Sequence, residues 1–154
     1  MQYQPANTYI SNASKIGRNS KEIRFPEIEA CAKELKSTHK KVGAIGYCYG
    51  GWACFQLGGK GKSLVDAISV AHPSLLTKEE IDNVAVPVQI LAPETDGMYT
   101  PELKVLRTPR QRLEYSNVCA DNVEKEHTLK VLPERNIEFD YQYFPGLAHG
   151  FAAK

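Results

Sequence analysis

A cysteine flanked by glycines is the first feature of this sequence that could do chemistry. Residues 46–51 read Gly-Tyr-Cys-Tyr-Gly-Gly, so Cys48 stands in a Gly-x-nucleophile-x-Gly pattern. Such a pattern forms a sharp turn between a strand and a helix and holds the nucleophile strained and exposed. Four cysteines and 11 glycines in 154 residues predict about 0.02 accidental matches. The competing interpretation is a buried, inert cysteine in a glycine-rich turn.

The glycines of this turn have a steric explanation. We expect side chains two positions before and after Cys48 to collide, and Gly51 to let the following helix approach the sheet closely. The turn also places the sulfur at a helix N-terminus, whose partial positive charge favours the thiolate over the thiol.

A thiol nucleophile needs a base, and the base needs an acceptor that orients it. His149 follows a predicted strand at 138–144, and Asp96 follows another at 86–92. Since the carboxyl ends of parallel strands meet at one edge of a sheet, both side chains are expected beside Cys48. The chain order of nucleophile, acid and histidine is that of the α/β-hydrolase fold. The pattern therefore predicts a Cys48-Asp96-His149 triad.

Four further residues are candidates for oxyanion or substrate contacts. The backbone N–H of Tyr49 is a candidate oxyanion donor, and Gly50 lies beside it in the turn. Tyr49 and Trp52 flank the nucleophile and are candidates to line a pocket, although aromatic residues there also serve packing. His72 precedes Asp96 along the chain, so we interpret it as structural or pocket-lining and not as the base.

Metal and cofactor chemistry finds no support in the spacing of residues. Cys48, His72 and His149 lack the intervals of a known metal motif, so we expect no metal and no cofactor. The cysteines Cys31 and Cys54 fall at helical apolar positions and are interpreted as core residues.

The remaining pattern predicts alternating strands and helices. Short apolar runs at 41–46, 66–71 and 86–92 are typical of strands buried on both faces, whereas 138–144 alternates as a half-exposed strand near a sheet edge does. Helices are expected from Pro26 over about three turns, at 50–57 and at 75–81. Strands that alternate with helices form a parallel sheet through right-handed crossovers.

Composition restricts the function further. The chain has 42% hydrophobic and 24% charged residues and a net charge of +1, which is typical of one soluble globular domain and makes nucleic acid and anionic membrane poor partners. The polar N-terminus lacks a secretory signal, so we expect reduced cysteines and a cytoplasmic protein. We divide the chain into an irregular leader at 1–24 and a domain at 25–154.

Four segments of the sequence resemble the dienelactone hydrolase family, most closely its fungal members. They are residues 41–51, 71–76 (Ala-His-Pro-Ser-Leu-Leu), 90–104 and 139–152, which end in Gly-Leu-Ala-His-Gly-Phe-Ala. The resemblance implies a three-layer, mostly parallel α/β-hydrolase-type sheet, here reduced to about four strands with flanking helices. It also implies a triad at Cys48, Asp96 and His149 that hydrolyses a lactone or small ester.

The sequence departs from this family in length. Only residues 1–45 precede the turn that carries Cys48, so we expect a domain truncated at both ends, without an identifiable second oxyanion donor. Residues 105–125 match nothing in the family. Because the strand before Cys48 is central in the parent fold, residues 42–45 would form a bare apolar edge, and we expect a homodimer or an aggregation-prone fragment.

Two alternatives to a lactone or ester hydrolase stay open. One is a catalytically impaired relative that serves as a binding or structural protein, or has no function. The other is a flavodoxin-like glutaminase or a DJ-1-type protein, which also carries cysteine in a glycine-rich turn. It is disfavoured because Trp52 and Phe151 stand where glutaminases carry a glutamine and an acid.

Overall fold

Four parallel strands form the centre of the computed structural model, which describes residues 18–62, 64–96 and 123–153. The strand order is β1-β2-β3-β4, with every neighbouring pair parallel. This confirms the predicted parallel α/β sheet. The strands are β1 (Gly43–Tyr47), β2 (Ala67–Ala71), β3 (Val88–Thr95) and β4 (Phe139–Ala148). The helices are α2 (Lys21–Thr38), α3 (Tyr49–Leu57), α4 (Lys78–Asp82), α6 (Val123–Glu134) and the 3₁₀ turn η2 (Phe151–Ala153).

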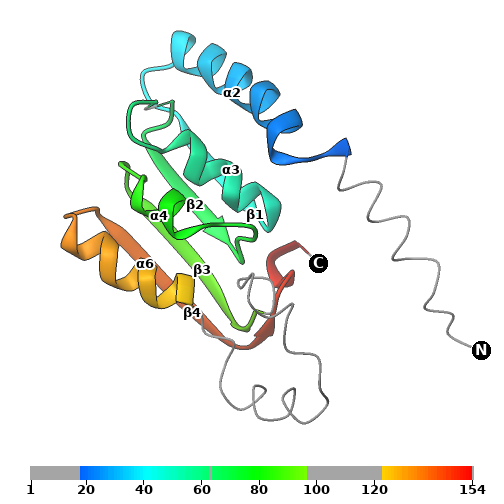
Figure 1. Cartoon of the computed structure of the whole chain (residues 1–154), viewed down its shortest axis with the longest axis vertical. Coiled ribbons are helices and arrows are strands. Elements are labelled where there is room, and N and C mark those ends of the chain that lie inside the picture. Colours follow the sequence, from blue (N-terminus) through cyan, green and yellow to red (C-terminus); the bar gives the residue numbers. More distant parts are fainter. Residues whose placement is uncertain (1–17, 63, 97–122, 154) are drawn as a thin grey trace, which may run out of the picture.

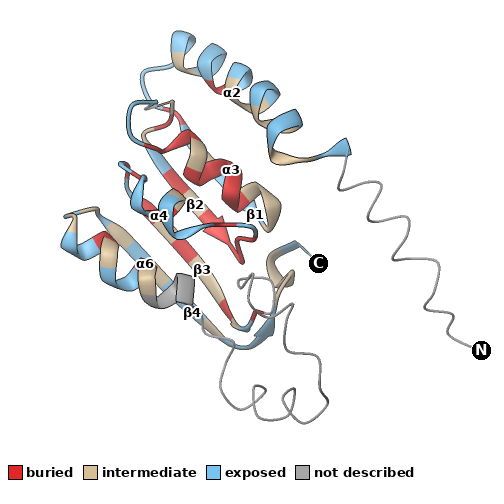
Figure 2. Ribbon diagram, in the orientation of Figure 1, coloured by how far each residue is buried: buried red, intermediate tan, exposed pale blue. Residues whose placement is uncertain are grey.

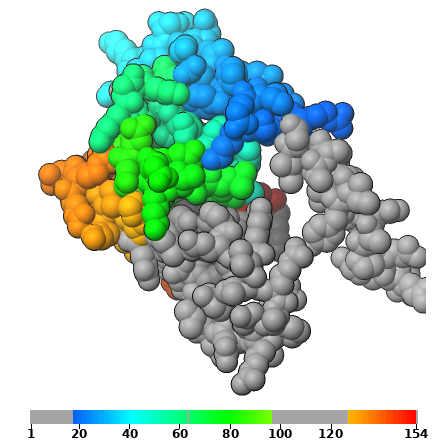
Figure 3. Space-filling model, in the orientation of Figure 1, coloured from blue at the N-terminus to red at the C-terminus, as the bar shows by residue number. Residues whose placement is uncertain are grey.

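The described helices lie in one layer over one face of the sheet. Each strand pairs with the strand before it along the chain, and right-handed crossovers then bring α3, α4 and α6 to the same side. In agreement, α2 contacts α3, α3 contacts α4 and α4 contacts α6 (Figure 1). In the space-filling view from this side, α2 (blue to cyan), α4 (green) and α6 (orange) form much of the coloured surface (Figure 3).

The two faces of the sheet differ in polarity. Beneath the helices lies the apolar core, where β2 and β3 contribute alternating buried residues (Figure 2): Ile68, Val70, Val88 and Ile90. On the other face, polar side chains connect three strands. Ser69 donates a hydrogen bond of 2.8 Å to Gln89, and Gln89 donates one of 3.0 Å to Asp140. The row of Ser69, Gln89 and Asp140 therefore makes the centre of this face polar, opposite the apolar core.

Strand β1 is more exposed than its sequence predicts. Its apolar run was expected to be buried on both faces, yet Ile45 is 73% exposed and Tyr47 is also exposed. The prediction was wrong because β1 is the edge strand and, within the described ranges, no helix covers this side of it. The edge position itself agrees with the bare apolar edge that the family resemblance implied for residues 42–45.

Helix α2 begins five residues before the predicted start at Pro26. Its first turn is held from outside, because Lys21 donates a hydrogen bond of 2.6 Å to the carbonyl of Leu75. Pro26 therefore lies within the helix and forgoes one backbone bond near its N-terminal end. The predicted apolar stripe is only partly buried: Ala32 is in the core, whereas Cys31 is exposed. Cys31 is thus not the core residue that we expected.

Several sequence predictions fall on other parts of the chain. Most of the leader, most of the unmatched segment 105–125 and the fourth cysteine, Cys119, lie outside the described residues. Cys54 is buried, as predicted. The cysteines Cys31, Cys48 and Cys54 are free thiols. Among the described residues, no helix combines the length and apolar character needed to cross a membrane.

Candidate active site

Cys48 occupies the single position between β1, which ends at Tyr47, and α3, which begins at Tyr49. Its backbone has φ 51° and ψ −115°, a conformation that non-glycine residues seldom adopt. Three backbone hydrogen bonds hold it there: its N–H donates to Ala71 at 3.1 Å, and its carbonyl accepts from Gly51 and Ser74 at 3.0 Å each. The surrounding turns therefore stabilise the strained backbone that presents the sulfur.

Two of the three glycines around Cys48 are sterically required. A Cβ on Gly46 would collide with the carbonyl group of Gly50 and come within 2.7 Å of Cys54 Sγ. A Cβ on Gly51 would lie 2.5 Å from Cβ of Pro73, so Gly51 allows α3 to contact the segment after β2. A Cβ on Gly50 would meet no described atom within 4 Å, so the collision expected there was wrong.

Strand pairing brings Asp96 and His149 together. Thr95 at the end of β3 is in register with Ala148 at the end of β4, and the N–H of His149 donates to the Thr95 carbonyl at 3.0 Å. A register shift precedes this pair, between Pro93 and Thr95. The acid and the histidine are therefore the first residues beyond two paired strand ends.

The side chains of Cys48, His149 and Asp96 form a connected line. The distance from His149 Nε2 to Cys48 Sγ is 3.2 Å, and the distance from His149 Nδ1 to Asp96 Oδ1 is 2.6 Å. Asp96 is 7% exposed, so its carboxylate is held away from solvent. When Nδ1 carries the ring proton, its N–H donates a hydrogen bond to Asp96. The lone pair of Nε2 then faces the thiol. The arrangement can transfer a proton from sulfur to nitrogen.

Ser74 is a neighbour of the sulfur that the sequence analysis missed. Its hydroxyl oxygen lies 3.3 Å from Cys48 Sγ, and the residue is almost fully buried. Ser74 follows β2 by three positions, at the same sheet edge as Asp96 and His149. The sequence offered one signal for Ser74: it is a polar residue just after β2, the strand that pairs with β1.

His72 packs against the base. It is 1% exposed, and its ring centroid lies 4.6 Å from that of His149 in an edge-to-face arrangement. Burial, followed by the nearby charge of His149, lowers the pKa of His72 and favours its neutral form. Neither of its ring nitrogens has a hydrogen-bond partner in the part of the chain that the structure describes. His72 thus lies in the site itself, beside the reacting groups.

Trp52 and Tyr49 lie on α3. Trp52 is 3% exposed, and its indole N–H donates a hydrogen bond of 2.8 Å to Glu80. Its ring packs against Phe25 and Tyr49, with centroid distances of 5.8 and 5.2 Å. The Trp52 side chain is therefore mostly buried against other side chains. The Tyr49 hydroxyl is buried as well, and this burial raises the pKa of Tyr49.

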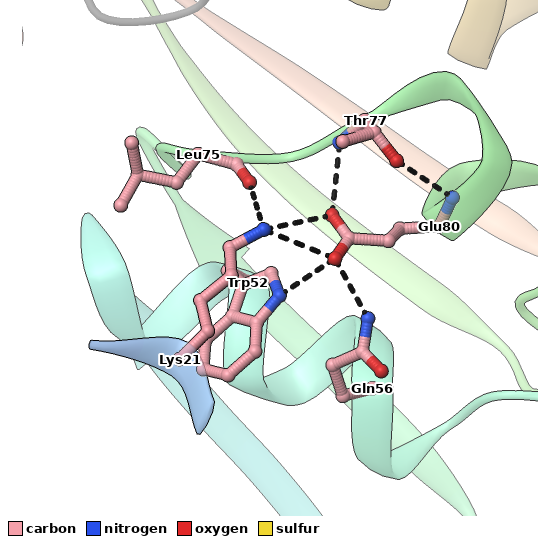
Figure 4. Close-up of polar contacts among 6 residues, drawn as sticks. All are labelled: Lys21, Trp52, Gln56, Leu75, Thr77 and Glu80. Carbon is pink, nitrogen blue, oxygen red and sulfur yellow. Dashed lines mark hydrogen bonds and ion pairs between the residues drawn. The ribbon is translucent and has the colours of Figure 1, made fainter. Parts of the chain in front are cut away.

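Glu80 ties the segment after β2 to two helices (Figure 4). Its carboxylate accepts hydrogen bonds from Trp52, from Gln56 at 2.9 Å and from the Thr77 N–H at 2.9 Å, and forms an ion pair of 3.0 Å with Lys21. Thr77 in turn caps α4 by accepting from the Glu80 N–H. The Thr-x-x-Glu spacing is the sequence signal for this capping box. The network fixes the segment that carries His72 and Ser74.

Comparison with known proteins identifies the family. The model of the dienelactone hydrolase family matches residues 6–154. The chain belongs to the dienelactone hydrolase family. Dienelactone hydrolases among the curated relatives include a protein of Gibberella moniliformis named Dienlactone hydrolase 1, which is 25% identical over 74% of this chain and 35% of its own length. The hydrolase tropI of Talaromyces stipitatus is 27% identical over 84% of this chain and 42% of its own length.

Solved structures show the same fold. A dienelactone hydrolase-like promiscuous phosphotriesterase, P91 from metagenomic libraries, superposes with a TM-score of 0.59 and 17% identity, covering 97% of this chain and 56% of that one. A structure named m3DLH gives a TM-score of 0.56 and 16% identity, with coverage of 96% and 55%. The chain therefore spans about two fifths of the length of these curated relatives and about half of these structures.

Proposed function

We propose that this protein hydrolyses a lactone or small carboxylic ester through a thioester formed on Cys48. The observation that carries the proposal is the connected line of Cys48, His149 and Asp96, with separations of 3.2 and 2.6 Å. Membership in the dienelactone hydrolase family supports the class of substrate. The proposed steps follow from the proton transfers that are possible between Cys48, His149 and the substrate.

In the first half of the reaction, His149 Nε2 removes the thiol proton of Cys48. The thiolate attacks the carbonyl carbon, and the carbonyl oxygen becomes an oxyanion in the tetrahedral intermediate. The carbon–oxygen bond to the leaving group then breaks, and the leaving oxygen takes the proton from His149. In a lactone this oxygen stays attached to the acyl chain, so the ring opens. Asp96 stabilises the imidazolium that forms between these two transfers.

In the second half, water releases the acid. His149 takes a proton from water, the resulting hydroxide attacks the thioester carbonyl, and the carbon–sulfur bond breaks. The Cys48 sulfur recovers its proton from His149. The backbone N–H of Tyr49, at the N-terminus of α3, is the proposed donor to the oxyanion in both halves.

Esters with acidic leaving groups suit this site best. A thiolate is itself a good leaving group, so the tetrahedral intermediate partitions toward the thioester only when the competing oxygen leaves readily. Enol and aryl oxygens leave more readily than alkyl alkoxides. We therefore expect enol lactones and aryl esters to react faster than ethyl esters of the same acid.

The test is burst kinetics with a 4-nitrophenyl ester. We expect a burst of one 4-nitrophenol per chain, lost in Cys48→Ala and retained in Cys31→Ala, since Cys31 is an exposed thiol on α2. Full activity of Cys48→Ala would refute the proposal.

Thiol alkylation separates the enzyme from an impaired relative. We expect iodoacetamide to modify Cys48 faster than exposed Cys31. Burial raises the pKa of Cys54 to about 11, so this thiol should stay unmodified near neutral pH. A missing burst together with equal rates at Cys48 and Cys31 would instead favour a binding or structural protein that retains the family's residues.

A further inference from the structure

We propose that Cys48, His72 and His149 together bind a thiophilic divalent cation such as Zn²⁺, which occupies the nucleophile and the base at once and reversibly blocks the site. One ligand atom from each of the three side chains lies within 4.8 Å of the other two. From the sequence we expected no metal here, because the intervals between these residues match no known metal-binding motif. The fold brings them together from the ends of three different strands.

The distances are close to those of a tetrahedral zinc site. Zinc binds sulfur and imidazole nitrogen at about 2.0–2.3 Å, so neighbouring ligand atoms are about 3.3–3.8 Å apart. Cys48 Sγ and His149 Nε2 are already 3.2 Å apart. With a separation of at most 4.8 Å, the third ligand, His72, needs a side-chain shift of only about 1 Å to complete this geometry.

The surroundings of His72 support a cation site independently of the distances. Its imidazole is 1% exposed, and both ring nitrogens lack a hydrogen-bond partner among the described residues. Buried polar groups normally have partners, because burial without one costs free energy. A cation held by one ring nitrogen would give that nitrogen a partner and remove part of this cost.

Asp96 supports the same site from outside. Histidines that bind metals usually donate the other ring N–H to a carboxylate, which fixes the ring and strengthens the ligand. His149 Nδ1 lies 2.6 Å from Asp96 Oδ1 and already has this partner. The two charges of the cation are balanced by the Cys48 thiolate and the Asp96 carboxylate. Three protein ligands leave a fourth position for water or a small chelator.

Binding must displace one proton. The Cys48–His149 pair shares one proton between Sγ and Nε2, in addition to the proton on Nδ1. Because a metal needs both lone pairs, this proton is released to solvent when the cation binds. No bond to carbon changes and no electron is transferred, so removal of the metal by a chelator restores the free thiol.

The experiment is a titration of the 154-residue chain with Co²⁺ in the presence of a phosphine reductant. Co²⁺ reports its own ligands, since bonding to sulfur produces a near-ultraviolet charge-transfer band. We expect a saturable band at one Co²⁺ per chain, displaced by Zn²⁺ and absent in Cys48→Ser. Loss of a residue that only supports a metal ligand weakens metal binding by roughly 10- to 100-fold. If His72 is itself a ligand, His72→Ala should weaken Co²⁺ binding by more than this. The matched control is His39→Ala, an exposed histidine at the end of α2, which should bind as the wild type does.

Two results would overturn the proposal. One is a wild-type protein without the band, and the other is a His72→Ala variant that binds Co²⁺ as tightly as the wild type. If His72→Ala does not fold, as judged by circular dichroism, X-ray absorption of the wild-type zinc complex decides. One sulfur and two imidazoles support the site, whereas a single imidazole excludes His72. Neither readout uses hydrolysis, so this test stands apart from the proposed activity.

Discussion

The hydroxyl of Ser74 lies 3.3 Å from the sulfur of Cys48, and the Ser74 N–H donates to the Cys48 carbonyl at 3.0 Å. The two residues are thus connected through both side chain and backbone. Since they follow neighbouring strands β1 and β2, the contact forms only when those strands are paired.

Ser74→Ala should slow the chemistry of Cys48 without unfolding the protein. A hydroxyl that donates to a thiolate stabilises it, and hydrogen bonds to charged groups contribute about 1.5 kcal/mol or more. We expect acylation by a 4-nitrophenyl ester and alkylation by iodoacetamide to slow by about 10-fold. Ser69→Ala is the control, because Ser69 lies on β2 and bonds to Gln89 on the polar face. Unchanged alkylation in Ser74→Ala would mean that Ser74 does not act on the thiolate.

Asp96→Asn should lower kcat by on the order of 10³- to 10⁴-fold, because the amide cannot stabilise the imidazolium and favours the wrong tautomer of His149. Single-turnover ester hydrolysis measures this effect. Asp140→Asn, on an exposed part of β4, is the matched control and should retain activity. A loss of less than 10-fold in Asp96→Asn would contradict the role of Asp96.

Glu80→Gln should destabilise the fold by about 1–3 kcal/mol. The Glu80 carboxylate accepts hydrogen bonds from several donors, and the NH₂ group of glutamine cannot accept any of them. The donors include Lys21 and the Thr77 N–H. Urea unfolding measures the change. Glu79→Gln, at an exposed neighbouring position on α4, should have the smaller effect. Equal urea midpoints for the two variants would show that the Glu80 network adds no stability.

Asp66 should make stability depend on pH in the acidic range. A hydrogen bond from Lys36 at 2.6 Å, then one from the Val42 N–H, lowers the pKa of Asp66 from 3.8 to about 2. The folded state therefore binds this proton less readily than the unfolded state, and the stabilisation is present above pH 3.8 and lost as pH falls through about 2.

Comparison of the wild type with Asp66→Asn tests this dependence. The difference in their free energies of unfolding should be constant near neutral pH and vanish towards pH 2. Glu34→Gln, at an exposed position on α2, is the matched substitution measured alongside. A difference between wild type and Asp66→Asn that persists below pH 2 would exclude this mechanism.

The exposed edge of β1 should pair with a second copy of this chain. Ile45 is 73% exposed, and in the described ranges no strand bonds to the outer side of β1. Two such edges can pair about a two-fold axis. Sedimentation should therefore show a dimer that Ile45→Lys dissociates. A monodisperse monomer at all concentrations would contradict this prediction.

The sequence predicted which three side chains would lie together better than it predicted their surroundings. The glycine pattern around Cys48 and the chain order of Asp96 and His149 were sufficient, because parallel strands end at one edge whatever lies between them. Ser74 and Glu80 were not among the residues predicted from the sequence. A polar residue after β2 and the Thr-x-x-Glu spacing were local signals, but the contacts of Ser74 with Cys48 and of Glu80 with Trp52 join segments that no local pattern relates. Neighbours across a fold depend on the packing of whole elements.

The errors have a related cause. Ile45 was expected to be buried because of its apolar run, and Cys31 because of its helical apolar position, but such patterns indicate only which side chains favour burial. Whether another element covers them depends on the rest of the fold. Similarly, Pro26 favoured a helix start, and the contact of Lys21 with Leu75 extended the helix beyond it.

The order in which the strands pair also sets when the site can appear during folding. Each strand adds beside the one made just before it, so the sheet can grow outward from β1 as the chain leaves the ribosome. Cys48 and His149 nevertheless stand 101 positions apart. Nascent chains that have not yet docked β4 would carry a thiol without its histidine neighbour, and the Cys48–His149 contact would form only when β4 joins the sheet.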